Sequence, residues 1–312
     1  MPSNSSPLGA LPARFRRQRV LIIGCGDVGQ RVAGLLSAGV NVMALTSSPD
    51  RQGALRAQGI TPLIGNLDAA ASLRRLSGLA HRVVHLAPPP NDDPLSRSDP
   101  RTTALLRALR LRSLPQAVVY GSTSGVYGDC QGQWVNESRA VAPSTARAHR
   151  RVHAEASLRH FGRSAGVAVH VLRIPGIYAS DRAGGTPRER LMKSTPVLQA
   201  MDDVYTNHIH ADDLARACLA ALRKGKPQRV VNVSDDSDSK MGDYFDLAAD
   251  LYGLPRPPRI SRALAATELP AMQVSFMSES RRLDNHRMKH ELRFVLRYPT
   301  VLAGLSAPRQ RY

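Results

Sequence analysis

The chain has 312 residues, enough to bury a sizeable core as one large domain with a smaller lobe or as two domains. Hydrophobic residues make up 42% of it and charged residues 22%, which argues against a disordered or fibrous protein. The formal net charge of +18 comes from basic residues spread along the sequence without a nucleic-acid-binding motif, so a phosphorylated, anionic ligand is expected and nucleic acid is not.

Residues 1–18 contain several arginines and no acidic residue, and they predict a disordered basic tail. The cysteines Cys25, Cys130 and Cys218 show neither a disulfide framework nor metal-ligand spacing, so we expect no bound metal and a reducing, cytoplasmic location. The longest uncharged run, residues 32–49, is too polar to cross a bilayer, and no membrane segment is expected.

Short runs of β-branched residues alternate with segments of helical length through much of the chain. Such alternation predicts a parallel sheet with crossover helices on both faces. We therefore predict an α/β fold, a Rossmann-type doubly wound parallel sheet, over residues 19–175 and 206–235. The predicted strands are residues 20–23, 40–45, 82–86, 117–120, 167–172 and 229–233, and the predicted helices are residues 30–37, 55–58, 70–76, 102–111 and 146–161.

The alternation of strands and helices breaks after residue 175. Glycines and prolines punctuate the sequence up to Asp203, and the pattern beyond Ser234 is mostly helical with proline-rich joints. Residues 176–205 and 236–312 are therefore expected to form a smaller, mostly helical lobe that binds substrate.

The first predicted strand runs directly into Gly24-Cys25-Gly26-Asp27-Val28-Gly29 and then a helix. In a dinucleotide-binding turn of this spacing, Gly24 permits the tight turn, Gly26 lets the backbone approach a pyrophosphate, and Gly29 lets the helix pack on the strand. The free N–H groups at Asp27 and Val28 would then face the phosphates. The alternative is a glycine-rich turn that binds nothing.

The choice between NAD and NADP depends on the residues after the second strand. An acidic residue there would bond the ribose of NAD, yet no Asp or Glu stands between Asp27 and Asp50. Thr46, Ser47 and Arg51 could instead receive a 2′-phosphate, which slightly favours NADP. The alternative is that Arg51 is only solvated, which leaves NAD open.

Further motifs follow in order along the chain. They are Gly65-Asn66-Leu67-Asp68, Val84-His85-Leu86-Ala87 with Pro88, Ser122-Thr123-Ser124-Gly125-Val126-Tyr127-Gly128, Leu172-Arg173-Ile174-Pro175-Gly176-Ile177-Tyr178, and residues 207–215. Their order resembles the extended short-chain dehydrogenase/reductases of the NAD-dependent epimerase/dehydratase family over nearly the whole chain. The glycine turn lacks one residue of the usual extended spacing, which places the chain in an atypical branch.

The resemblance implies roles for individual residues. Thr123 takes the catalytic Ser/Thr position, where its hydroxyl would orient a substrate oxygen. The residues it assigns to the cofactor are Asn66 and Leu67 at the adenine, Leu86, Ala87 and Pro88 after the fourth strand, Ser122, and Pro175 and Gly176 at the nicotinamide.

The family's Tyr-x-x-x-Lys pair is missing. Alignment on the motif's helix places Arg147 at the tyrosine position and Arg151 at the lysine position. Arginine cannot act as a general acid or base near neutral pH, although Arg151 could still hold ribose hydroxyls or a phosphate. The open candidates for a proton carrier are Tyr127, His149, His153, Tyr178 and His208. His149 and His153 share one helical face, and the alternative is that both point to solvent.

These observations predict an NAD(P)-dependent oxidoreductase or epimerase/dehydratase-like protein acting on a nucleotide-sugar-like or other small hydroxyl or carbonyl substrate. The alternative is a non-catalytic NAD(P)-binding sensor or regulatory protein, which the missing Tyr and Lys favour. A homodimer is one possible assembly.

Overall fold

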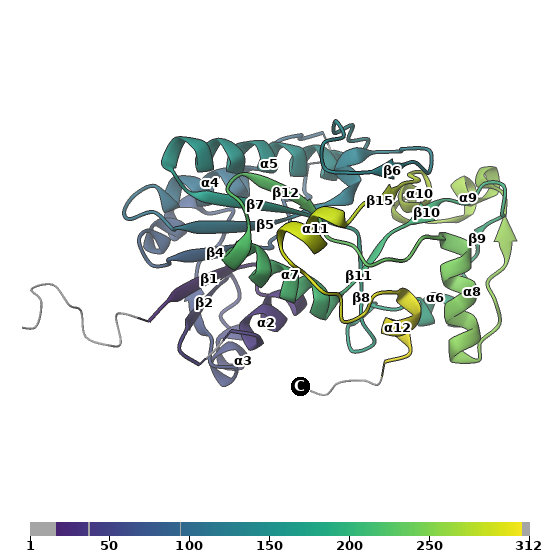
Figure 1. Ribbon diagram of the computed structural model, residues 1–312, viewed down its shortest axis with the longest axis horizontal. Helices are drawn as coiled ribbons and strands as arrows, with labels where there is room; N and C mark the ends of the chain where they lie inside the picture. The colour runs from purple at the N-terminus through teal and green to yellow at the C-terminus, as the bar shows by residue number, and fades with distance from the viewer. Residues whose placement is uncertain (1–16, 37, 94, 308–312) are drawn as a thin grey trace, which may run out of the picture.

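The computed structural model describes residues 17–36, 38–93 and 95–307. The predicted basic tail, residues 1–18, therefore lies almost wholly outside the described residues. Figure 1 shows a central sheet flanked by helices and, beside it, a second body built around α8 (Met241–Tyr252).

The central sheet has seven parallel strands in the order β12-β7-β5-β4-β1-β2-β3, which confirms the predicted Rossmann-type sheet. Its edge strand β3 is not among the strands predicted from the sequence, because Pro62 interrupts a short pattern. Proline is tolerated there because an edge strand leaves some backbone N–H groups unpaired. The strands are β1 (Arg19–Ile23), β2 (Asn41–Thr46), β3 (Thr61–Ile64), β4 (Arg82–His85), β5 (Ala117–Thr123), β7 (Ala168–Ile174) and β12 (Arg229–Asn232).

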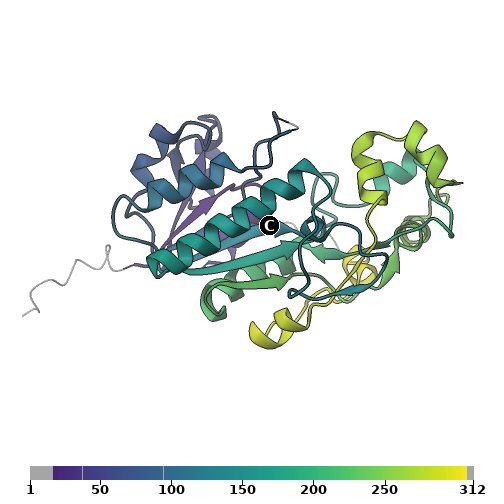
Figure 2. The same ribbon diagram turned by 90° about the horizontal axis from the view of Figure 1, so that it is seen from above.

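Helices cover both faces of this sheet, as predicted (Figure 2). On one face, Leu105 of α4 and Leu158 of α5 pack on alternate side chains of the strands. On the other face, Val32 of α2 and Leu214 of α7 join a second apolar layer. The helical elements are α2 (Asp27–Gly34), α3 (Arg51–Ala57), η1 (Ala70–Leu76), α4 (Pro100–Leu109), η2 (Ser124–Tyr127), α5 (Ala146–Ala165) and α7 (Ala211–Lys224).

The long helix α5 has clear sequence signals at both ends. The Thr145 side chain accepts a hydrogen bond from Ala148 N at its start, and Gly166 ends it with a left-handed φ of +68°. Such a hydroxyl cap and C-terminal glycine satisfy backbone groups that a helix leaves unpaired. They fix the register of the helix that carries Arg147 and Arg151.

The second body has an apolar cluster of its own that includes Tyr178, Val197 and Phe245. It contains short strand pairs as well as the predicted helices. Residues 286–294, by contrast, pack Met288 into the core of the sheet domain. The remaining elements are β6 (Trp134–Val135), β8 (Gly176–Tyr178), α6 (Arg188–Met192), β9 (Val197–Leu198), β10 (Tyr205–Thr206), β11 (His208–His210), β13 (Ser239–Lys240), β14 (Arg259–Ile260), α9 (Arg262–Glu268), α10 (Ala271–Met277), β15 (Arg282–Leu283), α11 (His286–Glu291) and α12 (Val301–Leu305).

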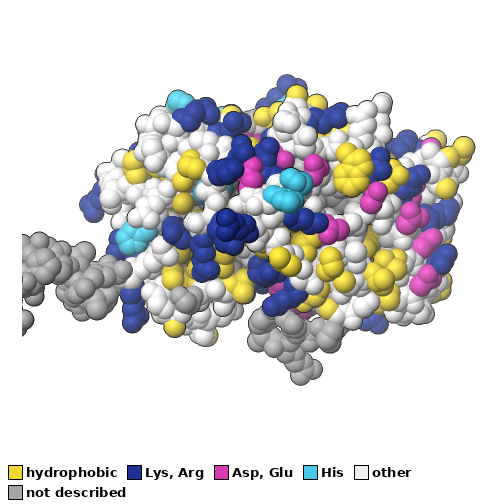
Figure 3. Space-filling view, viewed as in Figure 1, with side chains coloured by type: hydrophobic (Ala, Val, Ile, Leu, Met, Phe, Trp, Pro, Cys, Tyr) yellow, Lys and Arg dark blue, Asp and Glu magenta, His cyan; other side chains and the backbone are white. Residues whose placement is uncertain are grey.

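The basic side chains are dispersed over the face seen in Figure 3, with acidic and apolar side chains between them. In the part of the chain that the structure describes, no helix has the length and apolar character needed to cross a bilayer. Nor do the described residues bring together three or more His, Cys, Asp or Glu side chains in an arrangement that could hold a metal ion.

Candidate functional site

The candidate site lies where the order of the sheet reverses, between β1 and β4. Ligands of doubly wound sheets bind outside the carboxyl ends of the strands at such a point. The segments that follow the two strands meet there, because the N–H groups of Leu86 and Ala87 both donate to the carbonyl of Ile23, at 2.7 and 3.1 Å.

The three glycines of the turn have three different surroundings. A Cβ on Gly24, whose φ is +85°, would lie 2.4 Å from Ala87 N, and one on Gly29 would lie 2.9 Å from the Gly24 carbonyl oxygen. A Cβ on Gly26 would meet nothing within 4 Å. Gly24 and Gly29 are thus required by packing, whereas Gly26 leaves room for a pyrophosphate to approach the backbone.

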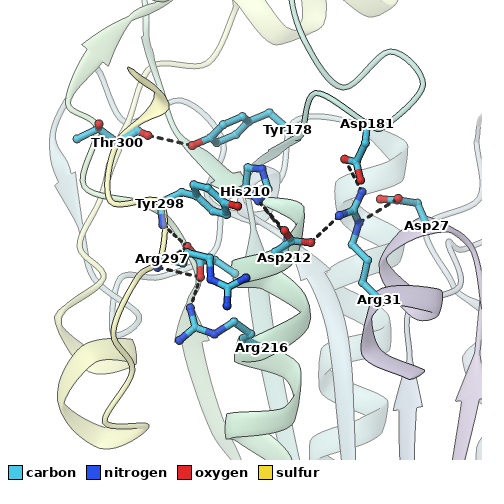
Figure 4. A network of polar contacts seen from close by, with 11 residues as sticks. Asp27, Arg31, Tyr178, Asp181, His210, Asp212, Arg216, Arg297, Tyr298 and Thr300 are labelled. Carbon is cyan, nitrogen blue, oxygen red and sulfur yellow. Dashed lines mark hydrogen bonds and ion pairs between the residues drawn. The ribbon is translucent and has the colours of Figure 1, made fainter. Parts of the chain in front are cut away.

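The helix behind this turn begins at Asp27, and Gly26 offers no side-chain cap to its N–H groups. The Asp27 carboxylate is held by two arginines, Arg31 at 3.1 Å and Arg182 at 2.6 Å. Arg31 also pairs with Asp181 at 2.7 Å and Asp212 at 2.5 Å (Figure 4). Sequence analysis missed both arginines, although the i,i+4 spacing of Asp27 and Arg31 is a usable signal.

Arg51 folds back over the glycine turn, donating to the carbonyl of Cys25 at 2.6 Å. Ser47 is exposed at the end of β2. The Thr46 hydroxyl is buried and bonds locally to the backbone of Ser48. Arg51 and Ser47 therefore lie beside the turn, while Thr46 shapes the strand end.

Beyond β3, the side chain of Asn66 accepts the N–H of Asp68 at 3.0 Å in a local turn. Arg101 holds Asp68 with two hydrogen bonds of 2.7 and 2.6 Å, which lower the pKa of that carboxyl, and it donates to the Pro88 carbonyl at 3.2 Å. Arg101 thus joins the loops after β3 and β4, where the sequence places the adenine contacts. Leu67 is half-buried between them.

Neighbouring residues at the end of β5 point to opposite faces. Ser122 is buried and donates to Glu155 at 2.5 Å, and Glu155 is in turn paired with Arg173 at 2.7 Å. Thr123 is half-buried, and its hydroxyl accepts the N–H of Gly125 at 3.2 Å. Because strand side chains alternate, Thr123 and not Ser122 turns its hydroxyl toward the site, so the predicted cofactor contact of Ser122 would have to come from its backbone.

Tyr127 is fully buried and does not reach the site. Its hydroxyl donates to Asn232 at 2.7 Å, and the Arg173 guanidinium lies 4.6 Å from its ring centre. Burial raises the pKa of this phenol. The expectation that Tyr127 acts catalytically is therefore corrected: the tyrosine joins β12 to the loop after β5.

The two arginines at the family's Tyr and Lys positions differ in their surroundings. Arg151 donates to the Tyr120 hydroxyl at 3.0 Å and to the Gly121 carbonyl at 2.7 Å, so it fixes the end of β5. Arg147 is an exposed residue that lies over the ring of Phe276 at 5.9 Å, and partial desolvation of its guanidinium and the charge of Arg151 lower its pKa. Among the described residues, no carboxylate lies within ion-pair distance of Arg147.

Three further candidate proton carriers have structural contacts. Nδ1 of His153 accepts the N–H of Asp99 at 3.1 Å. The Tyr178 hydroxyl donates to the Thr300 carbonyl at 3.1 Å (Figure 4). His208 is buried, which lowers its pKa to about 4, and packs 4.2 Å from a neighbouring tyrosine ring. His149 is half-buried on α5.

The lobe brings an unforeseen carboxylate, Glu279, to the site. It accepts hydrogen bonds from Ser144 at 2.6 Å and Arg281 at 2.7 Å, and its side chain is 10% exposed. A Cβ built on Gly125 would lie 3.6 Å from the Thr123 hydroxyl oxygen and 3.9 Å from Oε2 of Glu279. The two groups therefore flank one small space at the start of α5.

The turn after β7 completes the edge of the site. The N–H of Gly176 donates to the Asn207 carbonyl at 3.1 Å, and Gly176 itself is exposed. Pro175 is half-buried before it. The sheet thus brings the glycine turn, Thr123 and this turn to one edge.

A family model described as the NAD dependent epimerase/dehydratase family matches residues 20–234. A search of curated proteins returned no match. Among solved structures, a functionally unknown conserved protein from Silicibacter pomeroyi is 29% identical, with a TM-score of 0.76 over 92% of this chain and 96% of that chain.

Two solved epimerases share the fold at lower identity. UDP-glucose 4-epimerase from Thermotoga maritima, solved with UDP-glucose, is 18% identical, with a TM-score of 0.75 over 92% of this chain and 96% of that chain. UDP-glucuronic acid 4-epimerase from Bacillus cereus, solved with NAD, is 17% identical, with a TM-score of 0.72 over the same shares. The family match spans more than half of the sequence and includes the glycine turn, Thr123 and the turn after β7. The chain belongs to the NAD-dependent epimerase/dehydratase family.

Proposed function

We propose that this protein is an NAD(P)-dependent oxidoreductase or epimerase acting on a nucleotide-sugar-like or other small hydroxyl or carbonyl substrate. The observation that carries the proposal is the open space at Gly26, on the same sheet edge as Thr123. Solved structures of the same fold contain UDP-glucose or NAD, which supports this substrate and cofactor class.

The glycine turn at Gly26 and the loop after β4 would hold the dinucleotide, which would supply hydride chemistry at the substrate carbon. Thr123 would hold the oxygen on that carbon by a hydrogen bond. Glu279, across the same small space, is the group that we propose exchanges the oxygen's proton, in place of the missing tyrosine. Arg281 and Ser144 hold its carboxylate in position.

An anionic substrate suits the charges at this end of α5. Arg147 has no carboxylate within ion-pair distance among the described residues, yet it lies close enough to Glu279 for that carboxylate to raise its pKa against the opposing effect of desolvation. An unpaired guanidinium offers a planar pair of donors to a phosphate or carboxylate. Arg147 would therefore bind a charged group of the substrate.

For the cofactor, we propose a preference for NADP over NAD. Arg51 lies against the glycine turn and is not merely solvated, and Ser47 is exposed next to it. Both positions suit a 2′-phosphate on the adenosine ribose. We also propose a cytoplasmic location, which the three buried, unpaired cysteine thiols support.

Calorimetry with NADPH and NADH tests the proposal. Gly26→Val should weaken binding of both nucleotides by about tenfold or more, equal to about 1.4 kcal/mol, because its side chain fills the space for the pyrophosphate. Gly34→Val is the matched control, since Gly34 lies at the other end of α2 and also faces open space. The tighter nucleotide shows whether Arg51 receives a 2′-phosphate.

If the wild-type protein binds neither nucleotide, the Rossmann fold serves here only as a scaffold and the enzyme proposal falls. Steady conversion of UDP-glucose, or of another nucleotide sugar, with bound NAD(P) would in turn remove the non-catalytic sensor as an alternative.

A further inference from the structure

Asp27 presents an electrostatic problem for the proposed cofactor site. It is the first residue of α2 and follows Gly26 directly, so its carboxylate lies at the helix end that the pyrophosphate would approach. An acidic side chain is favourable there in the free protein, because it complements the helix dipole. The same negative charge would repel the two phosphates of a dinucleotide unless cations offset it.

Arg31, one of the two arginines paired with Asp27, donates to three carboxylates. Arg31 uses Nε for Asp27, Nη1 for Asp212 and Nη2 for Asp181, and its side chain is 11% exposed. Figure 4 shows it between the three carboxylates. Each of its three guanidinium nitrogens therefore already donates to a carboxylate, which makes Arg31 a fixed structural centre.

The second cation, Arg182, is held differently. It donates to Asp27 through Nη1 alone, and none of the described residues accepts from its Nε or Nη2. Its side chain is 29% exposed. Its backbone is fixed, because Arg182 N bonds to the Ala179 carbonyl at 3.3 Å and the Arg182 carbonyl accepts Gly185 N at 3.0 Å. Arg182 thus keeps unused donors on an accessible guanidinium beside the glycine turn.

We propose that Arg182 is a ligand of the dinucleotide pyrophosphate, with Asp27 as its positioning residue. The inference rests on the proposed function and names a residue that the glycine-turn motif does not contain. A guanidinium can bond a carboxylate with one edge and a phosphate oxygen with another.

A double-mutant cycle tests the inference, with ADP-ribose as the probe because it carries the pyrophosphate without a nicotinamide. Binding is measured by calorimetry for the wild type, Arg182→Gln, Asp27→Asn and the double variant. Arg182→Gln should weaken binding by about tenfold or more, the effect of losing a charge-assisted hydrogen bond. NADH should lose affinity by the same factor, since it shares the pyrophosphate.

The double variant shows whether Arg182 contacts the phosphates directly or only neutralises the negative charge of Asp27. If Arg182 contacts the phosphates, the double variant binds ADP-ribose several-fold more weakly than Asp27→Asn alone. If Arg182 only neutralises Asp27, the two bind equally, and the inference is overturned.

Arg188→Gln is the matched control, because Arg188 is an exposed arginine at the start of α6 in the same part of the chain. It should bind ADP-ribose as the wild type does; an equal loss of affinity in this variant would show a general charge effect and overturn the inference. Failure of the proposed function looks different: the wild type itself would then bind neither ADP-ribose nor the nicotinamide nucleotides.

Discussion

Thr123 and Glu279 form the reacting pair that we propose, and each is held by neighbours that do not react. Ser144 and Arg281 fix the Glu279 carboxylate at 2.6 and 2.7 Å, and Arg151 fixes the strand end before Thr123. Preorganisation of this kind keeps reacting groups within the narrow distances that proton transfer needs. The site thus has a defined carboxylate where the family's usual phenol is missing.

Replacement of Glu279 should therefore be costly to turnover. Glu279→Gln keeps the hydrogen bond from Ser144 but cannot exchange a proton, and kcat should fall by about 100-fold or more. Glu279→Asp should retain part of the activity with an altered pH profile. The measurement is kcat against pH with the first nucleotide sugar found to turn over. Glu268→Gln, an exposed residue of α9, is the control, and unchanged kcat in Glu279→Gln would remove the proposed role.

The residues to which the sequence could assign a predicted role are those whose signal is local. Gly24, Gly26 and Gly29 stand in register at a strand end, and Thr123 lies in a recognisable motif. Glu279 and Arg182 could not be found in this way, because the partners Ser144 and Asp27 lie 135 and 155 residues away in the chain. Only the folded topology brings these pairs together.

Among the elements, the unit from β1 through the glycine turn to α2 is tightly constrained at Gly24. Gly24 combines a left-handed φ of +85° with a Cβ position 2.4 Å from the Ala87 backbone, a contact that no side-chain rotation can relieve. Gly26 and Gly34 face open space. A side chain is thus excluded by the structure at Gly24 but has room at Gly26 and Gly34.

Gly24→Ala should lower the free energy of unfolding by about 3 kcal/mol or more, from the strained φ together with overpacking. Gly34→Ala is the matched control in the helix, and it should leave stability unchanged or raise it by up to about 1 kcal/mol. Urea denaturation measures both. Equal effects of the two substitutions would contradict the crowding at Gly24.

Prediction from the sequence failed at a strand that contains a proline and at a strand end where adjacent side chains point to opposite faces of the sheet. Strand β3 was not predicted because Pro62 interrupts its pattern. The motif around Ser122 and Thr123 did not show which of the two hydroxyls points into the core, which follows from the alternation of side chains along β5. Tyr127 was similarly placed by motif alone, whereas its side chain enters a buried contact with Asn232. The periodic, apolar strands β1, β4, β5 and β7 were predicted because their own sequence carries the signal.

Across the whole molecule, buried titratable groups make stability depend on pH. Burial lowers the pKa of His85 to about 3 and those of His170 and His208 to about 4. These side chains are neutral in the folded protein but charge on unfolding below their ordinary pKa near 6.5. Burial raises the pKa of Asp235 to about 7, so between its ordinary pKa of 3.8 and about 7 the folded state binds one proton more there than the unfolded state.

The buried histidines and Asp235 change the free energy of unfolding in opposite directions as the pH falls. The three histidines make stability fall as pH drops from 6.5 toward 4, and Asp235 offsets about one of their three protons. Through these four groups, the free energy of unfolding should therefore fall by about 2 kcal/mol per pH unit near pH 5. Urea titrations between pH 4.5 and 6.5 measure this slope. Asp235→Asn should steepen it by about 1 kcal/mol per unit, and an unchanged slope in this variant would contradict the raised pKa of Asp235.

The position of Arg31 also bears on how the protein is made. Its carboxylate partners Asp181 and Asp212 lie 150 and 181 residues further along the chain. Contacts between such distant residues form late, because loop closure over a long span is entropically unfavourable. During synthesis the glycine turn leaves the ribosome long before the residues that seat its helix. Cofactor could then act as a ligand of the finished fold, stabilising it by mass action, but not as a guide for the emerging chain.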